Sequence, residues 1–143
     1  MINQKKFDIL ESECSKCVMC SLSSTRNNVV FGRGNPNSSL FVIGEGPGQQ
    51  EDEQGLAFVG RAGKMLDSAF LSVGIDTNKD CYISNIVKCR PPNNRKPLAN
   101  EVKECMPWLN EQIELIKPKV IVLAGSTAVQ SYLNIDEPIS KLR

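Results

Sequence analysis

Residues 40–52 read Leu-Phe-Val-Ile-Gly-Glu-Gly-Pro-Gly-Gln-Gln-Glu-Asp, an apolar run followed at once by a glycine-rich, acidic turn. Such an apolar run, bounded by a turn, predicts a buried strand. The three glycines permit positive φ angles and let the backbone approach a ligand closely. We therefore expect a site at this turn, where Glu45, Glu51 and Asp52 lie beside peptide N–H groups. A plain turn with solvated acids is the alternative.

Length and composition indicate one ordinary domain. The 143 residues suffice to bury a core, and a hydrophobic content of 41% is typical of a globular protein. Residues 1–6 lack the apolar segment of a secretory signal, and no apolar run approaches the roughly 20 residues that cross a bilayer. We expect a single domain over residues 1–143, located in the cytoplasm and not bound to a membrane.

The chain contains no histidine and six cysteines. A Ser–His or Cys–His nucleophile pair and a histidine-ligated zinc site are therefore excluded within it. Any acid–base chemistry falls to carboxylates. In a reducing compartment, cysteines are more often metal ligands or buried thiols than disulfide partners.

The net charge of +1 hides an uneven distribution. Two segments, 14–44 and 86–100, contain basic residues and no acids; the residues are Lys16, Arg26, Arg33, Lys88, Arg90, Arg95 and Lys96. A phosphate backbone lying along both segments would explain this pattern. The alternative is that these charges only solvate loops.

Apolar runs and turn signals predict strands alternating with helices, which is typical of an α/β fold with parallel strands. Strands are expected at 29–31, 40–43, 81–87 and 120–124, and helices at 3–12, 63–73, 100–116 and from 126 to about 133. The unbroken apolar run at 120–124 predicts a fully buried strand. Pro107 predicts a kink or a new helix start just after Cys105.

Two further residues are candidates for base recognition. Phe58 lies in a glycine-bounded loop after the acidic turn, where it could be a stacking platform for a base or an ordinary core residue. Asn85 lies near the end of a predicted strand, at the edge where open α/β sheets bind ligands. Its amide could read a base edge or satisfy neighbouring loop backbone.

Cysteines recur at every third position from Cys14 to Cys20, so Cys17 can form a CxxC hairpin with either neighbour. One set of four thiolates comes from the hairpin, a strand end and a helix face: Cys17, Cys20, Cys89 and Cys105. The wide spacing of the second pair favours an iron–sulfur cluster over zinc, which remains the alternative. Cys81 is expected to be a buried hydrophobic side chain, and Cys14 a spare.

Five stretches carry a family resemblance. They are Cys17-x2-Cys20-x-Leu22-x3-Arg26, Gly44-Glu-Gly-Pro-Gly-x-x-Glu-Asp52, Phe58-Val-Gly-Arg-Ala-Gly63, Tyr82-Ile-x-Asn85-x-x-Lys-Cys89-Arg-Pro-Pro-x-Asn-Arg95 and Lys119-Val-Ile-Val-Leu-x-Gly125. In order and spacing they resemble the family 4 (type 4, iron–sulfur) uracil-DNA glycosylases, from about Cys17 to Arg143. The resemblance implies a three-layer α/β/α fold with a short parallel sheet. It also implies a DNA-repair hydrolase that cleaves the N-glycosidic bond of uracil.

The resemblance further implies the site residues. A 4Fe-4S cluster would be bound by Cys17, Cys20, Cys89 and Cys105. Uracil, flipped out of uracil-containing DNA, would stack on Phe58 and be read by Asn85. The catalytic candidates are Glu45, Gly46 and Asn85, and the substrate-binding set adds Pro47, Gly48, Glu51 and Phe58. DNA contacts are expected from Arg90, Arg95, Lys96 and Ser126.

Two departures qualify the resemblance. Gly46 stands where other uracil-DNA glycosylase families place a water-orienting aspartate. This is normal for family 4 and leaves the role to Glu45 or to backbone groups. The family also continues into another strand and a His-Pro motif, so we expect this chain to be C-terminally incomplete. In the family, the histidine of this motif stabilises the departing uracil. Losing one such hydrogen-bond donor typically costs about 10²–10³ in rate, so severely reduced activity is expected.

Two other classes of function remain as alternatives. One is a catalytically silent iron–sulfur DNA-binding domain, related to the glycosylase-like modules fused to some phage DNA polymerases. The other is a zinc-stapled α/β scaffold without a nucleic-acid role. In each case we expect a monomer.

Overall fold

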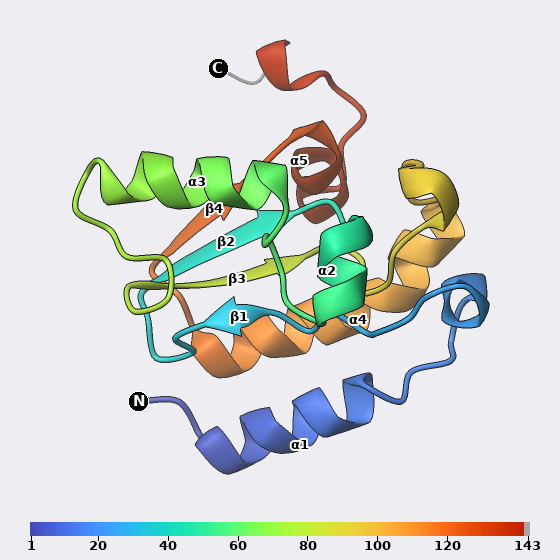
Figure 1. Cartoon of the computed structure of the whole chain (residues 1–143), viewed down its shortest axis with the longest axis horizontal. Coiled ribbons are helices and arrows are strands. Elements are labelled where there is room, and N and C mark those ends of the chain that lie inside the picture. Colours follow the sequence, from blue (N-terminus) through green and yellow to red (C-terminus); the bar gives the residue numbers. More distant parts are fainter. Residues whose placement is uncertain (142–143) are drawn as a thin grey trace.

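The strands form one mixed sheet, seen in Figure 1 of the computed structural model, which describes residues 1–141. The strands are β1 (Arg33–Gly34), β2 (Leu40–Gly44), β3 (Cys81–Asn85) and β4 (Val120–Leu123). Their order is β1-β3-β2-β4, with β3 and β4 parallel to β2 and β1 antiparallel to β3. The predicted α/β fold is confirmed, and its sheet is mixed because of this short edge strand.

Helices cover both faces of the sheet (Figure 1). They are α1 (Gln4–Cys14), α2 (Gln49–Gln54), α3 (Arg61–Leu71), α4 (Ala99–Ile116) and α5 (Ser126–Leu133), with 3-10 turns at Ser21–Ser24, Pro92–Asn94 and Ile139–Lys141. Helices α1 and α4 lie over one face and α3 over the other. No helix among residues 1–141 is long and apolar enough to cross a membrane.

The larger core lies between the sheet and the pair α1 and α4. At its centre, Phe7 of α1 makes edge-on ring contacts with Phe31 and Tyr82, at centroid distances of 5.4 and 5.5 Å. Tyr82 in turn contacts Phe41 of β2 at 5.4 Å. Such edge-to-face pairs add stabilisation beyond area burial. These contacts hold α1 against the sheet, and the end of α1 leads directly into the cysteine-rich segment.

The register of the parallel strands determines where the site lies. Gly44, the last residue of β2, pairs with Asn85, the last residue of β3. Because the carboxyl ends of parallel strands meet at one edge, the glycine-rich turn and the loop after β3 start side by side. This edge is where open α/β sheets bind ligands.

Three local expectations are wrong. Residues 29–31 form no strand, and the short edge strand lies instead at Arg33–Gly34, just after the predicted range. No new helix starts after Cys105, because α4 continues as one helix through the exposed Pro107. Strand β4 is an edge strand and is only partly buried, with Val120 55% exposed.

Helix α3 packs on the sheet by a narrower stripe than its apolar spacing predicts. Leu66 and Phe70 pack against the smaller core, formed by residues such as Val42 and Ile83. Met65 and Val73, which continue the apolar spacing of residues 63–73, are 71% and 70% exposed. The helix therefore contributes to the site mainly through its first turn.

Candidate functional site

A small cavity lies at the carboxyl edge of β2 and β3. It is lined by Gly46, Glu51, Phe58, Ala62, Gly63 and Asn85. Its volume of about 80 Å³ is several times the roughly 10–15 Å³ that one water needs, so the cavity has room for more than a single water. The cavity brings together Phe58 and Asn85, which lie 27 positions apart in the numbering.

Asn85 supplies the polar wall of this cavity. The residue is 2% exposed, and its side-chain oxygen Oδ1 accepts no hydrogen bond from any residue in the range 1–141. Buried polar atoms without a partner are rare in folded proteins, and each needs an explanation. An amide oxygen in a cavity can accept an N–H from a bound heterocycle, which would satisfy it.

Phe58 supplies the apolar wall, and close packing defines its position. Its φ is +53°, which is uncommon for a bulky residue. A methyl group on Gly44 would collide with the Phe58 ring and come within 2.7 Å of Asn85 Oδ1. A methyl group on Gly63 would collide with the Phe58 carbonyl. Two glycines are therefore needed for the ring to lie where it does.

Arg33 holds the backbone of the Phe58 loop from behind. Its Nε donates to the carbonyl of Ala57 at 2.6 Å, and its Nη2 donates to the carbonyl of Phe58 at 3.0 Å. The same guanidinium pairs with Asp67 of α3 at 2.8 Å, and its side chain is 9% exposed. The expectation that Arg33 faces a phosphate backbone is therefore wrong, because its donors are used inside the protein.

The acids of the glycine-rich turn after β2 have different roles. Both oxygens of Glu51 accept backbone N–H groups, from Gly48 at 2.9 Å and from Val59 and Gly60 at 2.9 and 2.5 Å. Glu51 therefore ties the turn to the Phe58 loop while lining the cavity. Asp52 is buried and binds the backbone N–H groups of residues 27 and 28.

Glu45 lies half-buried in the turn and is not among the residues that line the cavity. Its backbone carbonyl accepts the N–H of Val87 at 3.1 Å, which joins the turn to the loop after β3. Pro47 is buried and Gly48 half-buried in the same turn. The structure thus brings Phe58, Asn85, Glu51 and Gly46 to one cavity, with Glu45 beside it rather than in its wall.

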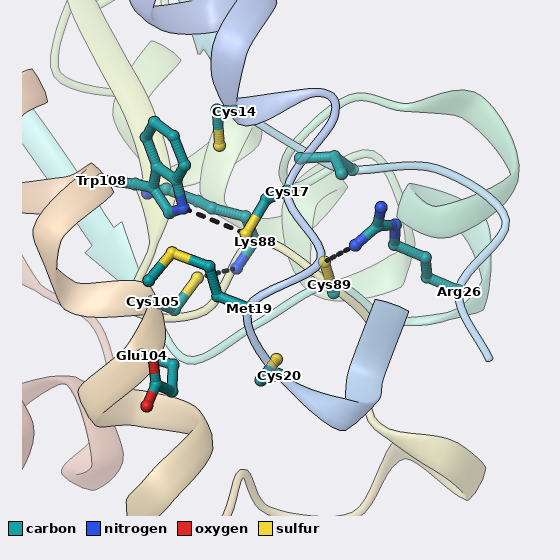
Figure 2. A pocket seen from close by; sticks show the side chains of 11 residues that line it. Cys14, Cys17, Met19, Cys20, Arg26, Lys88, Cys89, Glu104, Cys105 and Trp108 are labelled. Atoms are coloured by element: carbon teal, nitrogen blue, oxygen red, sulfur yellow. Dashed lines mark hydrogen bonds between the residues drawn. The ribbon is translucent and has the colours of Figure 1, made fainter. Parts of the chain in front are cut away.

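A second pocket gathers five of the six cysteines. Its walls include Cys14, Cys17, Cys20, Cys89 and Cys105, with Arg26, Lys88 and Trp108 beside them. In Figure 2 the sulfur atoms of the four predicted ligands lie around one space, and Cys14 lies near the end of α1. Cys81 is fully buried elsewhere, in the smaller core, as predicted.

Nitrogen donors point at three of the predicted ligands (Figure 2). Arg26 Nη1 donates to Cys89 Sγ at 3.3 Å, Trp108 Nε1 to Cys17 Sγ at 3.3 Å, and the backbone N–H of Lys88 to Cys105 Sγ at 3.1 Å. Hydrogen bonds of this kind tune cluster sulfurs in iron–sulfur proteins. Sequence reasoning did not assign this role to Arg26 or Trp108. The spacing of Trp108, three residues after Cys105 on a helix, was the available signal.

Burial raises the pKa of the thiols in this pocket. The pKa of Cys105 rises to about 11 and that of Cys14 to about 12, in both cases because of desolvation, which Lys88 partly offsets. Burial also raises the pKa of Cys89, and the Arg26 hydrogen bond opposes it. Thiolates at these positions therefore need a bound cation to balance them, which a metal centre supplies.

The predicted ligands are four thiols, a donor set that both zinc and an iron–sulfur cluster accept. No group of three or more His, Cys, Asp or Glu side chains in the range 1–141 is arranged to hold one metal ion. Four sulfurs around zinc would each lie about 2.3 Å from one point. The thiolates of a four-iron cluster bind different irons and lie farther apart, around a larger space.

The predicted DNA-contacting residues lie on the segments that follow β3 and β4. Arg90 Nε donates to Asn94 at 2.7 Å, and Lys96 and Ser126 are exposed. Arg95 is committed to Glu101, with its two terminal nitrogens 2.7 and 2.9 Å from the carboxylate oxygens. Arg90, Arg95 and Lys96 lie in the loop between β3 and α4, and Ser126 is the first residue of α5.

Comparison with known proteins shows which family the chain resembles. The family model described as the uracil DNA glycosylase superfamily matches residues 31–142. The type-4 uracil-DNA glycosylase of Thermotoga maritima is 44% identical over 131 residues, which cover 92% of this chain and 68% of the relative. The type-4 enzyme of Archaeoglobus fulgidus is 42% identical over 131 residues, covering 92% of this chain and 65% of the relative.

A DNA polymerase of Bacillus phage SP01 is also similar, with 33% identity over 112 residues, or 78% of this chain and 12% of the polymerase. The matches to five type-4 relatives span between 53% and 68% of the length of each relative.

Proposed function

Since the chain belongs to the family of type-4 uracil-DNA glycosylases, we propose that it hydrolyses the N-glycosidic bond of uracil flipped out of DNA. The observation that carries the proposal is the unpartnered, buried Oδ1 of Asn85, in a cavity whose other wall is the Phe58 ring. An apolar stacking face and an amide edge are the two features that recognise a pyrimidine ring.

Recognition begins with extrusion of the nucleotide. The scissile bond is shielded in a stacked duplex, and unstacking costs roughly a few kcal/mol, which contacts in the pocket offset. Phe58 stacks against the ring, and Asn85 pairs with its polar edge. Glu51 acts through the backbone it binds at Gly48, Val59 and Gly60 and fixes the Phe58 loop against the glycine-rich turn.

Hydrolysis then exchanges one bond at C1′ of the sugar. The bond from N1 of uracil to C1′ breaks, uracil leaves as an anion, and a water oxygen bonds to the oxocarbenium-like carbon. Glu45, beside the cavity, is the group we assign to orient that water and take its proton, with the backbone of Gly46 as a further contact. The Asn85 amide N–H stabilises charge on the departing base.

The four thiolates of Cys17, Cys20, Cys89 and Cys105 are the proposed ligands of a 4Fe-4S cluster. When bound, the cluster supplies a covalent cross-link between the N-terminal segment, the loop after β3 and α4. This cross-link would order the basic, proline-rich loop after β3, because Cys89 directly precedes Arg90 in that loop. Arg90, Lys96 and Ser126 are the proposed phosphate contacts, and Arg95 shapes the loop through Glu101.

A single-turnover excision assay on uracil-containing single-stranded DNA tests the proposal. Asn85→Ala should lower the excision rate by about 10²–10³, as expected for the loss of one preorganised donor. The visible absorption of the cluster should stay unchanged, because Asn85 lines a different pocket from the thiolates. Excision by Asn85→Ala at the wild-type rate would refute the assigned role.

The phage polymerase relative favours a second candidate function, a DNA-binding domain without catalysis. Both functions predict binding that weakens steeply with salt, because phosphate contacts release counterions. They differ in the product. Salt-dependent binding of uracil-containing DNA with no release of uracil under single-turnover conditions would support the binding domain, whereas an abasic product would support the glycosylase.

A further inference from the structure

Lys88 is a buried cation that neither pocket alone explains. The residue is 1% exposed, and its Nζ donates to Ser84 Oγ at 2.6 Å and to the backbone carbonyl of Asn85 at 2.8 Å. Both acceptors are neutral. Among residues 1–141, no carboxylate lies within ion-pair distance of this ammonium. A buried charge without a counter-charge costs several kcal/mol, so one is expected nearby.

The groups that can carry negative charge around Lys88 are thiols. They come from three elements: Cys14 from α1, Cys89 from the loop after β3, and Cys105 from α4. Lys88 itself lines the cysteine pocket, and its backbone N–H donates to Cys105 Sγ at 3.1 Å. Four thiolates on an iron–sulfur core would leave a net negative charge in the pocket that Lys88 lines.

The ammonium of Lys88 contacts a residue that lines the base-binding cavity. Asn85 is the last residue of β3, and its carbonyl is one of the two acceptors of Lys88 Nζ. The second acceptor, Ser84 Oγ, also donates to the carbonyl of Phe31 at 2.7 Å, which anchors the assembly in the larger core. The carbonyl of Asn85 is therefore held by the ammonium of the residue whose backbone N–H donates to the thiol of Cys105.

We propose that Lys88 couples the two sites: its ammonium offsets the negative charge of the thiolate-bound cluster, and the same ammonium positions Asn85 for the base. The proposal rests on the proposed function and assigns Lys88 as a positioning residue, since it contacts neither substrate nor the reacting atoms. Charge compensation and hydrogen bonding are separate properties, so different substitutions test them separately.

Lys88→Met removes both properties while keeping an unbranched apolar chain. In the cluster-containing protein we expect a more negative reduction potential, because the substitution removes a cation that stabilises the reduced, more negatively charged cluster. We also expect kcat for uracil excision to fall roughly tenfold to a hundredfold through misplacement of Asn85, with KM for DNA nearly unchanged. The matched control is Lys79→Met, which removes the same charge from an exposed side chain before β3. This control should change neither the reduction potential nor kcat.

Two further variants separate the charge from the hydrogen bond. Lys88→Gln keeps a donor but no charge, so it should shift the potential as Lys88→Met does and keep more of kcat. Ser84→Ala keeps the charge and removes one acceptor, so it should leave the potential unchanged and lower kcat a few-fold. These variants carry the test if Lys88→Met does not retain its cluster. A wild-type potential in Lys88→Gln or a wild-type kcat in Ser84→Ala would then overturn the proposal.

The NMR resonance of the Asn85 side-chain amide gives a readout that needs no catalysis. It should move in Lys88→Met and stay in place in Lys79→Met. If the wild-type protein excises no uracil while this resonance and the potential respond as expected, the proposed function fails and the coupling stands. If Lys88→Met changes only one of the two, or neither, the coupling is wrong.

Discussion

Gly44 leaves room for both walls of the base-binding cavity. Its position at the end of β2 faces the Phe58 ring on one side and the Asn85 amide oxygen on the other. Any side chain there would occupy the space that separates them. The function of this glycine is therefore steric, and it does not depend on a positive φ.

Gly44→Ala should abolish uracil excision, because the added methyl group collides with Phe58 and crowds Asn85 Oδ1. We expect a loss of at least about 10² in single-turnover rate, comparable to the loss of a catalytic donor. Gly74→Ala is the control. A methyl group there meets nothing within 4 Å, so it should cost only about 1 kcal/mol of stability through its positive φ and leave the rate unchanged. Equal rates for both variants would contradict the steric role.

Helix α4 organises the cysteine pocket by placing functional side chains along one face. Glu101, Cys105 and Trp108 follow one another at intervals of four and three residues, so they project on the same side. Glu101 accepts from Arg95 and from Ser21 at 3.3 Å, while Trp108 donates to Cys17. One helix thus contacts both the N-terminal segment and the loop after β3.

The Glu101 pair predicts an acid-sensitive contribution to stability. The Arg95 hydrogen bond holds the pKa of Glu101 at about 2, below the ordinary value of 4.5, against the opposing effect of burial. A pKa that is lowered by folding stabilises the folded state above the unfolded-state value. This stabilisation is therefore complete above about pH 5 and is lost as the pH falls from about 4.5 towards 2.

Glu101→Gln should lower the free energy of unfolding at pH 7 by about 1–3 kcal/mol, the range for hydrogen bonds to charged groups. The difference from wild type should shrink steadily below about pH 4.5, because the carboxylate of the unfolded wild-type protein takes up a proton there, whereas that of the folded protein does so only near pH 2. Urea unfolding of both proteins across this pH range measures it. A difference that stays constant with pH would show that the ion pair is not its source.

At the scale of the whole molecule, the cysteine pocket joins segments that are distant in sequence. Cys17 and Cys20 come from the N-terminal segment, Cys89 from the loop after β3, and Cys105 from α4. A metal centre that binds them all would contribute its binding free energy to folding. Cys14 lines the same pocket and is fully buried, so comparing it with Cys89 tests which thiols are ligands.

Cys89→Ala should lose the visible absorption of the cluster and lower the unfolding midpoint, because a ligand is removed. Cys14→Ala should keep the absorption and the iron content, and cost only the stability expected for a small cavity. Iron and sulfide analysis of anaerobically purified proteins, together with thermal unfolding, measures both. Loss of iron in Cys14→Ala with retention in Cys89→Ala would reverse the assignment.

Short-range patterns were sufficient to predict β2, β3 and the helices α1, α3, α4 and α5, because an apolar run or a helical stripe encodes one element locally. The short, polar helix α2 was missed, because its residues were expected to form part of the glycine-rich turn. They also brought Phe58 and Asn85 forward as candidates, since each follows a strand or turn with a clear signal. Local pattern could not distinguish a central strand from an edge strand, so β4 was expected to be fully buried although its order in the sheet places it outermost.

Charged residues were the least predictable, because their role depends on partners from remote segments. Arg26, Arg33 and Lys88 belong to acid-free stretches that resemble a phosphate-binding track, yet they bind Cys89, the Phe58 loop and the end of β3. Apolar periodicity and glycine placement act over a few residues, so the amino-acid sequence alone predicts their effects. A buried cation finds its acceptors only when distant elements pack together, so those assignments required the folded protein.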